Sequence, residues 1–502
     1  MSILQSLRNI FKRGKYAMTS QSLGNITEHP KIAINKDEYD RIQKNLKYYQ
    51  SKWDPIRYRN SNRVDKQRAR NHLPIARTAC KKIASLVFNE QAEISVANRT
   101  TNEFIQSVLL NDRFNKNFER YLESCLALGG LAMRPYVDDD KIKISFVQAP
   151  VFYPLQSNTQ DVSSAAIINK SQKTVGKETI YYTLVELHEW TKDKKYTITN
   201  ELYRSSEKER VGDRVPLSDI YEDLEEEVTL DGLTRPLFTY LKPPGMNNKD
   251  INSPLGLSIF DNAKSTIDFI NTTYDEFKWE VRMGQRRVLV PDQTVRIGFD
   301  HHGETDLVTR EFDPEQNVYE QIDGGKDTSI NITDLTTPIR SDDYIKAINE
   351  GLALFEMQVG VSPGMFTFDG KSMKTATEVV SENSDTYQLR NSIVSLVDQS
   401  IKELVISICE IGKLYGLYSG PIPEMDDITV NLDDGVFVDK NNELDYYAKA
   451  LLSGLVSKQY AISKALGLSD KEAAQMLADI KKETAESMEL ERSQSEVDIY
   501  GE

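Results

Sequence analysis

Apolar positions along the chain follow two different periods, and the change from one to the other divides the first half of the sequence. Apolar residues recur three and four positions apart in residues 37–52 and 72–128, which predicts helices there. The segment 141–146 instead alternates apolar and polar residues. Two further runs rich in aromatic and β-branched residues, 179–190 and 196–203, are separated by a short polar turn. The pattern therefore predicts helices followed by an antiparallel β-sheet that contains a hairpin.

After a boundary predicted at Pro243-Pro244-Gly245, long apolar stripes with heptad spacing begin. The first stripe predicts a helix at 255–284, roughly 42 Å long. A second stripe predicts a helix at 341–359, and short strands between turn signals predict a small β insert at 286–340. The first stripe consists of Phe260, Ala263, Ile267, Ile270, Tyr274, Phe277 and Val281.

The segment from Gly360 to Ser372 contains three glycines and Pro363, so it breaks the helix that precedes it. Beyond this loop a stripe at residues 376–415 predicts a helix of roughly 60 Å, which suits an elongated subunit of an assembly better than a compact domain. A strand at 428–432 and three short helices complete the pattern.

Composition and charge narrow the class of protein. At about 150 residues per domain, 502 residues suggest about three domains. No apolar run approaches the roughly 18 residues of a membrane helix. The three cysteines lie far apart in the sequence, which excludes a disulfide framework. The five histidines show no zinc-binding motif, which argues against a zinc enzyme.

The net charge of −15 is unevenly distributed. Residues 1–100 hold 20 Lys and Arg against 8 Asp and Glu, a balance of +12, so the remainder carries −27. The densest basic stretch is 57–82. Two interpretations of it stay open: a contact with nucleic acid or another acidic partner, and a solvated face or subunit interface that meets the acidic remainder of the chain. The absence of base-reading motifs favours the second.

Candidate catalytic motifs fail on their spacing. The segment from Gly364 to Ser372 has five residues between its glycines, whereas a Walker A loop has four and follows a buried strand. Acidic residues at 433–445 lack the glycine of an EF-hand loop. The helical tail, 424–502, holds 18 acidic and 8 basic residues, a net −10 that argues against a DNA-binding helix-turn-helix. We therefore predict no catalytic residues, no metal site and no cofactor.

The order of these segments resembles that of the portal proteins of tailed bacteriophages, and four local sequences are similar to the portal family of Gram-positive siphophages. These sequences are SPLGLSIF (253–260), DFINTTYDEF (268–277), VSPGMFTF (361–368) and KTATEV (374–379). The resemblance covers essentially the whole chain and is strongest at 250–420.

The resemblance implies a multi-domain α+β portal fold with a mixed α/β wing, long stem helices, a small β-rich clip and an α-helical crown. The implied segments are the wing (1–250), stem helices (251–285 and 341–359), the clip (286–340), a tunnel loop (360–374), a long wing helix (375–423) and the crown (424–502).

The implied function is a ring of about twelve subunits, closed by heterologous contacts, at one capsid vertex of the virion. Double-stranded DNA would pass through it without sequence preference during packaging and ejection. The implied partners are the terminase large subunit, a head–tail adaptor, and the major capsid and scaffolding proteins, with no membrane contact and with assembly in the cytoplasm of the bacterial host. Two alternatives are a DNA-packaging ATPase and a coiled-coil cytoplasmic scaffold.

The resemblance also implies three groups of site residues. The DNA channel and tunnel loop group is Val361, Ser362, Pro363, Gly364, Met365, Phe366, Lys371 and Lys374. The basic residues at the junction of stem and clip are Arg286 and Arg287. The subunit interface group, on the first heptad stripe, is Phe260, Ile267, Tyr274 and Phe277.

Overall fold

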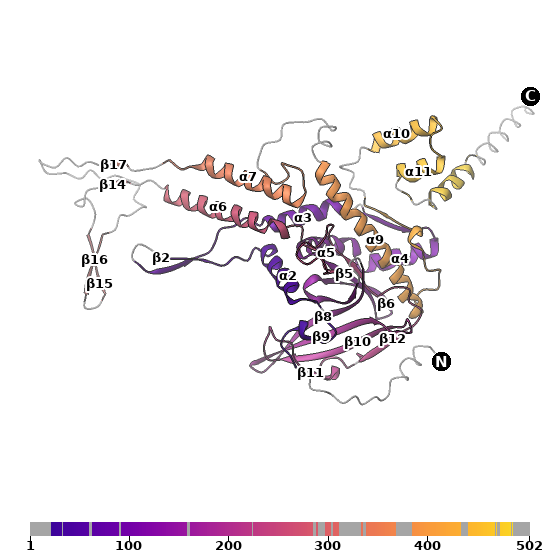
Figure 1. The fold of residues 1–502 in the computed structure, drawn as a ribbon, viewed down its shortest axis with the longest axis horizontal. Helices are drawn as coiled ribbons and strands as arrows, with labels where there is room; N and C mark the ends of the chain where they lie inside the picture. Colours follow the sequence, from indigo (N-terminus) through magenta and orange to yellow (C-terminus); the bar gives the residue numbers. More distant parts are fainter. Residues whose placement is uncertain are drawn as a thin grey trace, which may run out of the picture. The chain divides into compact units, whose positions relative to one another are not determined.

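The fold was analysed in a computed structural model that contains both helices and β-sheets (Figure 1), as the predicted α+β class requires. The structure describes residues 22–32, 34–59, 63–89, 92–157, 161–222, 224–284, 288–289, 297–302, 305–310, 333–334, 338–367, 384–432, 440–466, 468, 472–482 and 484. The chain divides into two compact units. The first unit comprises residues 1–53, 74–264 and 356–502, and the second comprises 54–73 and 265–355.

The described part of the first unit combines helices with three sheets. Its helices are α2 (Lys36–Tyr49), α3 (Ile75–Val87), α4 (Arg99–Asn111), α5 (Phe114–Leu128), α9 (Ser384–Leu414), α10 (Lys440–Leu452) and α11 (Lys458–Leu466). Its strands are β1 (Ser22–Leu23), β4 (Glu93–Val96), β5 (Leu131–Asp138), β6 (Lys141–Gln148), β7 (Phe152–Ser157), β8 (Val162–Val175), β9 (Glu178–Trp190), β10 (Tyr196–Ser205), β11 (Gly212–Val215), β12 (Glu227–Leu230), β13 (Thr239–Leu241) and β18 (Ile428–Asn431).

The largest sheet among the described residues has seven strands in the order β1-β11-β10-β9-β8-β7, with β12 also paired to β10. Its centre is the predicted hairpin of β9 and β10, in which Tyr196 pairs with Trp190, so this prediction is confirmed. A smaller sheet has the order β13-β5-β6. The turn between β5 and β6 places Asp139 and Asp140 at φ values of 47° and 56°, a left-handed conformation that Asp tolerates better than most residues.

The predicted helical stretch 72–128 is partly wrong, because a strand interrupts it. Strand β4 pairs antiparallel with β18, with Val96 opposite Ile428. The partner lies more than 300 positions away in the sequence, so no local pattern could reveal it. Local helical spacing therefore described α3, α4 and α5 correctly but missed the strand between the first two.

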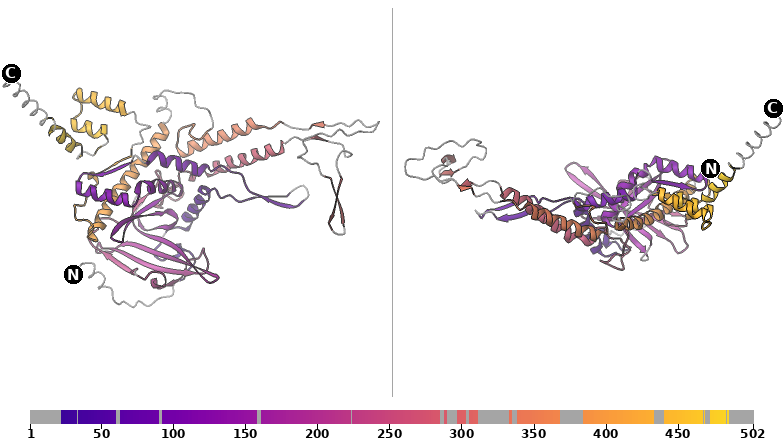
Figure 2. Two further views of the ribbon diagram at one scale, coloured as in Figure 1. Left: turned by 180° about the vertical axis from the view of Figure 1, so that it is seen from behind. Right: turned by 90° about the horizontal axis from the view of Figure 1, so that it is seen from above.

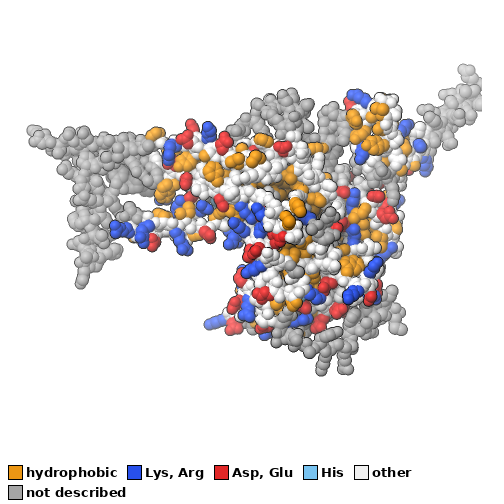
Figure 3. Space-filling model, in the orientation of Figure 1, with side chains coloured by type: hydrophobic (Ala, Val, Ile, Leu, Met, Phe, Trp, Pro, Cys, Tyr) orange, Lys and Arg blue, Asp and Glu red, His pale blue; other side chains and the backbone are white. Residues whose placement is uncertain are grey.

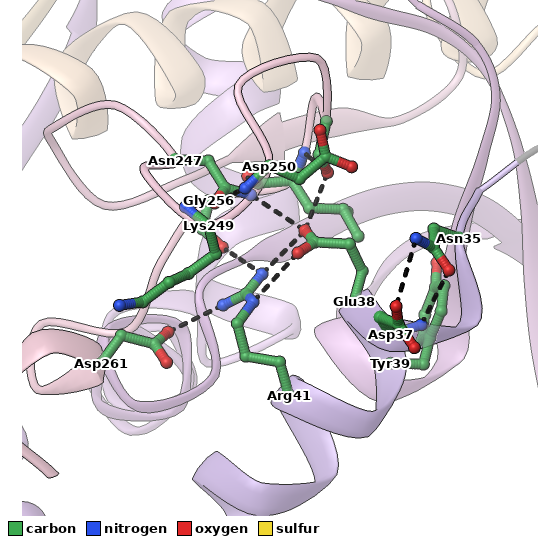
Figure 4. Close-up of polar contacts among 12 residues, drawn as sticks. Asn35, Asp37, Glu38, Tyr39, Arg41, Asn247, Lys249, Asp250, Gly256 and Asp261 are labelled. Atoms are coloured by element: carbon green, nitrogen blue, oxygen red, sulfur yellow. Dashed lines mark hydrogen bonds and ion pairs between the residues drawn. The ribbon is translucent and has the colours of Figure 1, made fainter.

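The predicted helix 255–284 begins later than expected, at Lys264. Arg41 on α2 holds the preceding segment, since its guanidinium donates to Asp261 at 2.7 Å and to the carbonyl of Gly256 at 3.1 Å (Figure 4). Gly256 also lies so close to Gly129 that a Cβ atom on it would be 2.5 Å from the carbonyl oxygen of Gly129. These contacts keep the residues before Asp261 out of the helix.

Helix α9 confirms the long helical prediction over its described length of 31 residues, about 46 Å. Its apolar stripe is buried in the first unit. The buried residues of this stripe are Ile393, Val397, Ile401, Leu404, Ile408 and Ile411. Arg390, a charged residue on this stripe, donates to the backbone carbonyls of Leu86 and Leu432. Residues 375–383 lie outside the described residues.

The second unit contains most of two long helices, α6 (Lys264–Met283) and α7 (Ser341–Val359). Its described part also contains three pairs of short strands. The pairs are β2 (Ile56–Arg59) with β3 (Asp65–Arg68), β14 (Val288–Leu289) with β17 (Thr333–Asp334), and β15 (Ile297–His302) with β16 (Thr305–Arg310). In the β15–β16 hairpin, His301 pairs with Asp306 and His302 with Thr305. None of the described helices is long and apolar enough to cross a membrane.

Candidate functional site

The first half of the predicted tunnel loop is held by one carboxylate on α7. Glu356, whose side chain is fully buried, accepts backbone hydrogen bonds from Gly364 at 2.9 Å and Thr367 at 3.1 Å, and a further one from Phe366. Three amides of the loop therefore converge on a single side chain.

Two further helices hold the same segment. The ammonium of Lys82 on α3 donates to the carbonyl of Met365 at 2.8 Å and lies 5.4 Å from the ring centroid of Phe366. On α9, Ser362 and Thr386 exchange backbone-to-hydroxyl hydrogen bonds of 2.8 and 3.1 Å. Helices α3, α7 and α9 thus all contact residues 362–367, which we call the loop base.

The local sequence explains how the chain turns into the loop base. Helix α7 ends because Gly360 adopts φ 82°, a left-handed conformation that glycine reaches at little cost. The amides of Gly360 and Val361 both donate to the backbone carbonyl of Glu356 at 3.0 Å, which closes the last turn. Gly364, at φ 85°, then turns the backbone toward the Glu356 carboxylate.

The structure describes six of the predicted channel residues, namely Val361, Ser362, Pro363, Gly364, Met365 and Phe366. Val361 and Ser362 are buried at 2% and 1% exposure, whereas the other four are partly or fully exposed. Lys371, Lys374, Arg286 and Arg287 lie outside the described residues, so their predicted channel role stays a prediction.

The predicted subunit interface requires a correction at two positions. Phe260 and Ile267 are 0% and 1% exposed within their own chain, so neither side chain presents a surface to another subunit. Tyr274 and Phe277 are half-buried. For them a contact with a neighbouring subunit stays a prediction.

Within the second unit, the stripe on α6 packs on α7. Phe277 stacks on Tyr344 with ring centroids 5.3 Å apart. A Cβ atom on Gly351 would lie 2.7 Å from Cγ1 of Ile270, so glycine allows the two helices a close approach. Arg340 adds an exposed ion pair with Glu280 at 3.0 Å. The heptad pattern located the apolar stripe on α6 correctly, but α7 of the same chain packs against much of that stripe.

The β2–β3 hairpin is attached to α6 through Asp275. Arg68 donates to both oxygens of Asp275, at 2.8 and 2.7 Å. The backbone and side-chain nitrogens of Asn71 donate to the same carboxylate at 3.0 and 2.8 Å. The hydrogen bonds from Arg68, followed by those from Asn71, hold the pKa of Asp275 well below its usual value.

Sequence reasoning missed both Glu356 and Asp275 as positioning residues. Each is an acidic residue that falls beside an apolar helical stripe, which is the one signal that the sequence offered. Such a residue is buried only when donors surround it. The donors come from distant segments and were not visible from the spacing.

A polar pocket beside α2 offers no catalytic arrangement. Its lining residues are Asn35, Asp37, Glu38, Arg41, Lys249, Asp250, Asp261 and Lys264. Several of these charges pair with one another, as Lys264 does with Asp261 at 2.6 Å. Burial raises the pKa of Asp261, but the opposing effects of Lys264 and Arg41 leave it below its ordinary value. Among the described residues, no group of three or more His, Cys, Asp or Glu side chains is arranged to hold a metal ion.

The chain was compared with curated proteins, with solved structures and with protein families. A search of curated proteins finds no matching relative. Among solved structures, the chain is similar to a chain in the virion of a native gene transfer agent particle, at 11% identity and a TM-score of 0.41, covering 78% of this chain and 89% of that one. A chain from the neck of the native particle, computed with C12 symmetry, matches with the same coverage at 12% identity and a TM-score of 0.38. A chain from the neck of the empty particle, computed with C6 symmetry, matches with the same coverage at 13% identity and a TM-score of 0.36.

The family comparison is more extensive. The family described as phage portal protein, SPP1 Gp6-like, matches residues 28–490, which include the loop base, both long helices of the second unit and the β2–β3 hairpin. The chain therefore belongs to the SPP1 Gp6-like family of phage portal proteins.

Proposed function

We propose that the protein assembles into a closed ring of about twelve copies and that double-stranded DNA passes through the central channel during packaging and ejection. The observation that carries this proposal is the family match across residues 28–490. The ring would stand at one vertex of the capsid, and its assembly would take place in the cytoplasm of the bacterial host.

Proteins of this family are structural, non-enzymatic channels, so the alternative of a DNA-packaging ATPase is set aside. The spacing of Gly364 and Gly370 agrees with this, because it does not match that of a phosphate-binding loop. We expect Lys371→Ala to leave any trace of ATP hydrolysis unchanged.

The net charge suits a channel that DNA must move through. Twelve copies at −15 would carry about −180, and such a ring would not hold DNA tightly by electrostatic attraction. Basic residues near the DNA would then be few and local, with Lys371, Lys374, Arg286 and Arg287 as the candidates. We assign the loop 360–374 to the narrowest part of the channel because the resemblance implies a tunnel loop there and because its glycines and Pro363 interrupt the helices on either side.

The remaining segments receive the roles that the resemblance implies. We assign 1–250 and 375–423 to the wing, 251–285 and 341–359 to the stem, 286–340 to the clip and 424–502 to the crown. The clip would bind the terminase large subunit first and a head–tail adaptor afterwards. The wing and crown would contact the capsid and scaffolding proteins.

Electron microscopy of the purified full-length protein tests the ring. We expect closed rings with a central hole, whereas rods or dimers would support a coiled-coil scaffold instead. A protein that stays monomeric by light scattering at all practical concentrations would overturn the proposal.

A second experiment tests the role of the clip. Deleting residues 290–335 and bridging the ends with glycines should leave ring formation intact and abolish terminase binding. Undiminished binding by the shortened ring would place the docking site elsewhere on the protein.

A further inference from the structure

The β2–β3 hairpin presents basic side chains, most of which pair with no acidic residue in the part of the chain that the structure describes. Figure 3 shows several Lys and Arg side chains on this face of the molecule. On the hairpin, Arg57, Arg59, Arg63 and Lys66 are all exposed. The one acidic residue among them, Asp65, pairs with Arg59 at 3.0 Å. The side chains of the other three have no ion-pair partner among the residues that the structure describes. Arg68, at the base of the hairpin, is already paired with Asp275.

Helix α7 presents an acidic surface at its N-terminal half. Asp342, Asp343 and Glu350 are exposed there, with one lysine, Lys346, among them. Asp343 and Glu350 lie seven positions apart and so form one stripe along the helix. This stripe lies on the exposed side of α7. The buried residues Ile348 and Leu352 are roughly 150–170° around the helix from it, and Tyr344 and Gly351, which contact α6, are roughly 100° from it.

These two charged surfaces lie on opposite sides of α6. The hairpin and its continuation contact Asn271, Asp275 and Trp279. Helix α7 contacts Ile270 and Phe277. At about 100° per residue, the two sets of contacts are roughly 150° apart around the helix. The second unit is therefore layered as hairpin, α6 and α7, with exposed basic side chains on the hairpin and an exposed acidic stripe on α7.

The two surfaces also lie at the same level along α6. Arg68 meets Asp275 and Trp279, and Tyr344 meets Phe277, so both layers approach the C-terminal half of the helix. Figures 1 and 2 show the hairpin extending beside α6 in the direction in which that helix runs.

We propose that the β2–β3 hairpin of one copy contacts the Asp343–Glu350 stripe on α7 of the next copy. This inference rests on the proposed function, since it requires a ring. In a ring built from heterologous contacts, one side of each subunit meets the other side of its neighbour, and a subunit with a basic layer on one side and an acidic layer on the other satisfies that requirement. One exposed apolar side chain on each surface, Tyr58 on the hairpin and Leu354 beside the stripe on α7, adds contact area.

A charge-exchange experiment on the full-length protein tests this contact. The hairpin variant is Arg57→Glu with Lys66→Glu, and the helix variant is Asp343→Arg with Glu350→Arg. The control, Lys170→Glu with Lys173→Glu, makes the same change in charge as the hairpin variant at two exposed positions on β8. Circular dichroism and thermal melts of all variants verify that each one is folded.

We expect each of the two single-surface variants to need a protein concentration at least about tenfold higher than the wild type for half-maximal ring assembly, and the control to assemble normally. An equimolar mixture of the two variants should regain assembly, because alternating copies pair a reversed hairpin with a reversed helix and a native hairpin with a native helix. One chain that carries all four substitutions should also assemble alone.

Three results would overturn the inference, and each differs from failure of the proposed function. A hairpin variant that assembles as readily as the wild type but releases packaged DNA would assign the basic surface to DNA. A hairpin variant that assembles normally and behaves as the wild type in every respect would leave the hairpin with no role in assembly. A mixture that stays unassembled, although both variants are folded, would show that the two surfaces do not meet. Absence of rings in the wild type, by contrast, would contradict the proposed function itself.

Discussion

The carboxylate of Glu356 lies 2.9 Å from the backbone nitrogen of Gly364, and this contact joins the end of α7 to the loop that follows it. A carboxylate buried without donors would be strongly unfavourable, so the loop amides and the side chain stabilise each other. Because Lys82 and Thr386 contact the same segment, the loop base is attached to three helices. If DNA passes through the channel as proposed, we expect these residues to keep one conformation.

Replacing Glu356 tests whether it determines the conformation of the loop base. Glu356→Gln has one carbonyl oxygen in place of two carboxylate oxygens and brings a buried NH₂ group among backbone donors. We expect a loss of about 1–3 kcal/mol in the free energy of unfolding and faster hydrogen exchange at the amides of Gly364, Phe366 and Thr367. Glu209→Gln, the same substitution at an exposed position outside both α7 and the loop base, is the control. Unchanged exchange at these three amides would show that the loop base is held by other contacts.

The parts of the fold that the sequence predicts are those in which the contacting residues lie close together in the sequence. The β9–β10 hairpin, helix α7 and most of α9 follow from local spacing, because neighbouring residues supply their hydrogen bonds. Strand β4 was missed because its partner, β18, is distant in the sequence. The late start of α6 was missed because Arg41, from α2, holds the residues before it.

The candidate site shows the same limit. Glycine and proline spacing located the break after Val359, and a local pattern sufficed for that. The pattern could not reveal that Glu356, on the preceding helix turn, binds the loop amides. Heptad spacing likewise identified an apolar stripe on α6 but not what covers it, since α7 and a neighbouring subunit would leave the same pattern in the sequence.

The ion pair between Arg68 and Asp275 makes the attachment of the hairpin dependent on pH. A carboxylate with a lowered pKa in the folded protein contributes stability above its unfolded pKa of about 4 and loses that contribution as the pH falls toward the folded value. We expect Asp275→Asn to cost about 1–2 kcal/mol at pH 7 and progressively less below about pH 4.

Denaturation of the wild type and of Asp275→Asn across this pH range measures the difference. The control is Asp65→Asn, which alters only the exposed pair with Arg59. A difference between Asp275→Asn and the wild type that stays constant from pH 7 to pH 2 would show that the carboxylate charge does not stabilise the hairpin.

The close approach of α6 and α7 at Gly351 predicts that even a methyl group is unfavourable there. A Cβ atom would lie 2.7 Å from Ile270 and 3.2 Å from Phe269. We expect Gly351→Ala to destabilise the protein by about 1–3 kcal/mol, although alanine has the higher helix propensity by about 1 kcal/mol. The exposed Ala353→Gly on the same helix isolates the propensity effect. If Gly351→Ala raises the melting temperature, the two helices are not in close contact at this position.

The exchange of hydrogen bonds between Ser362 and Thr386 allows the loop base to be locked covalently. Both residues are buried, and the paired contacts of 2.8 and 3.1 Å place their backbones close enough for a disulfide. The native cysteines would not compete, because burial raises the pKa of the thiols of Cys80, Cys125 and Cys409.

If the loop base stays fixed during DNA passage, oxidised Ser362→Cys/Thr386→Cys rings should package DNA at the rate of the reduced rings. Mass spectrometry verifies that the bond has formed, and Ser362→Ala/Thr386→Ala controls for loss of the two hydroxyl groups. Packaging that stops on oxidation and resumes on reduction would show that residues 362–367 must separate from α9 while DNA moves. In that case the contact between Ser362 and Thr386 would have to break during DNA passage, and the loop base would be a moving part of the channel.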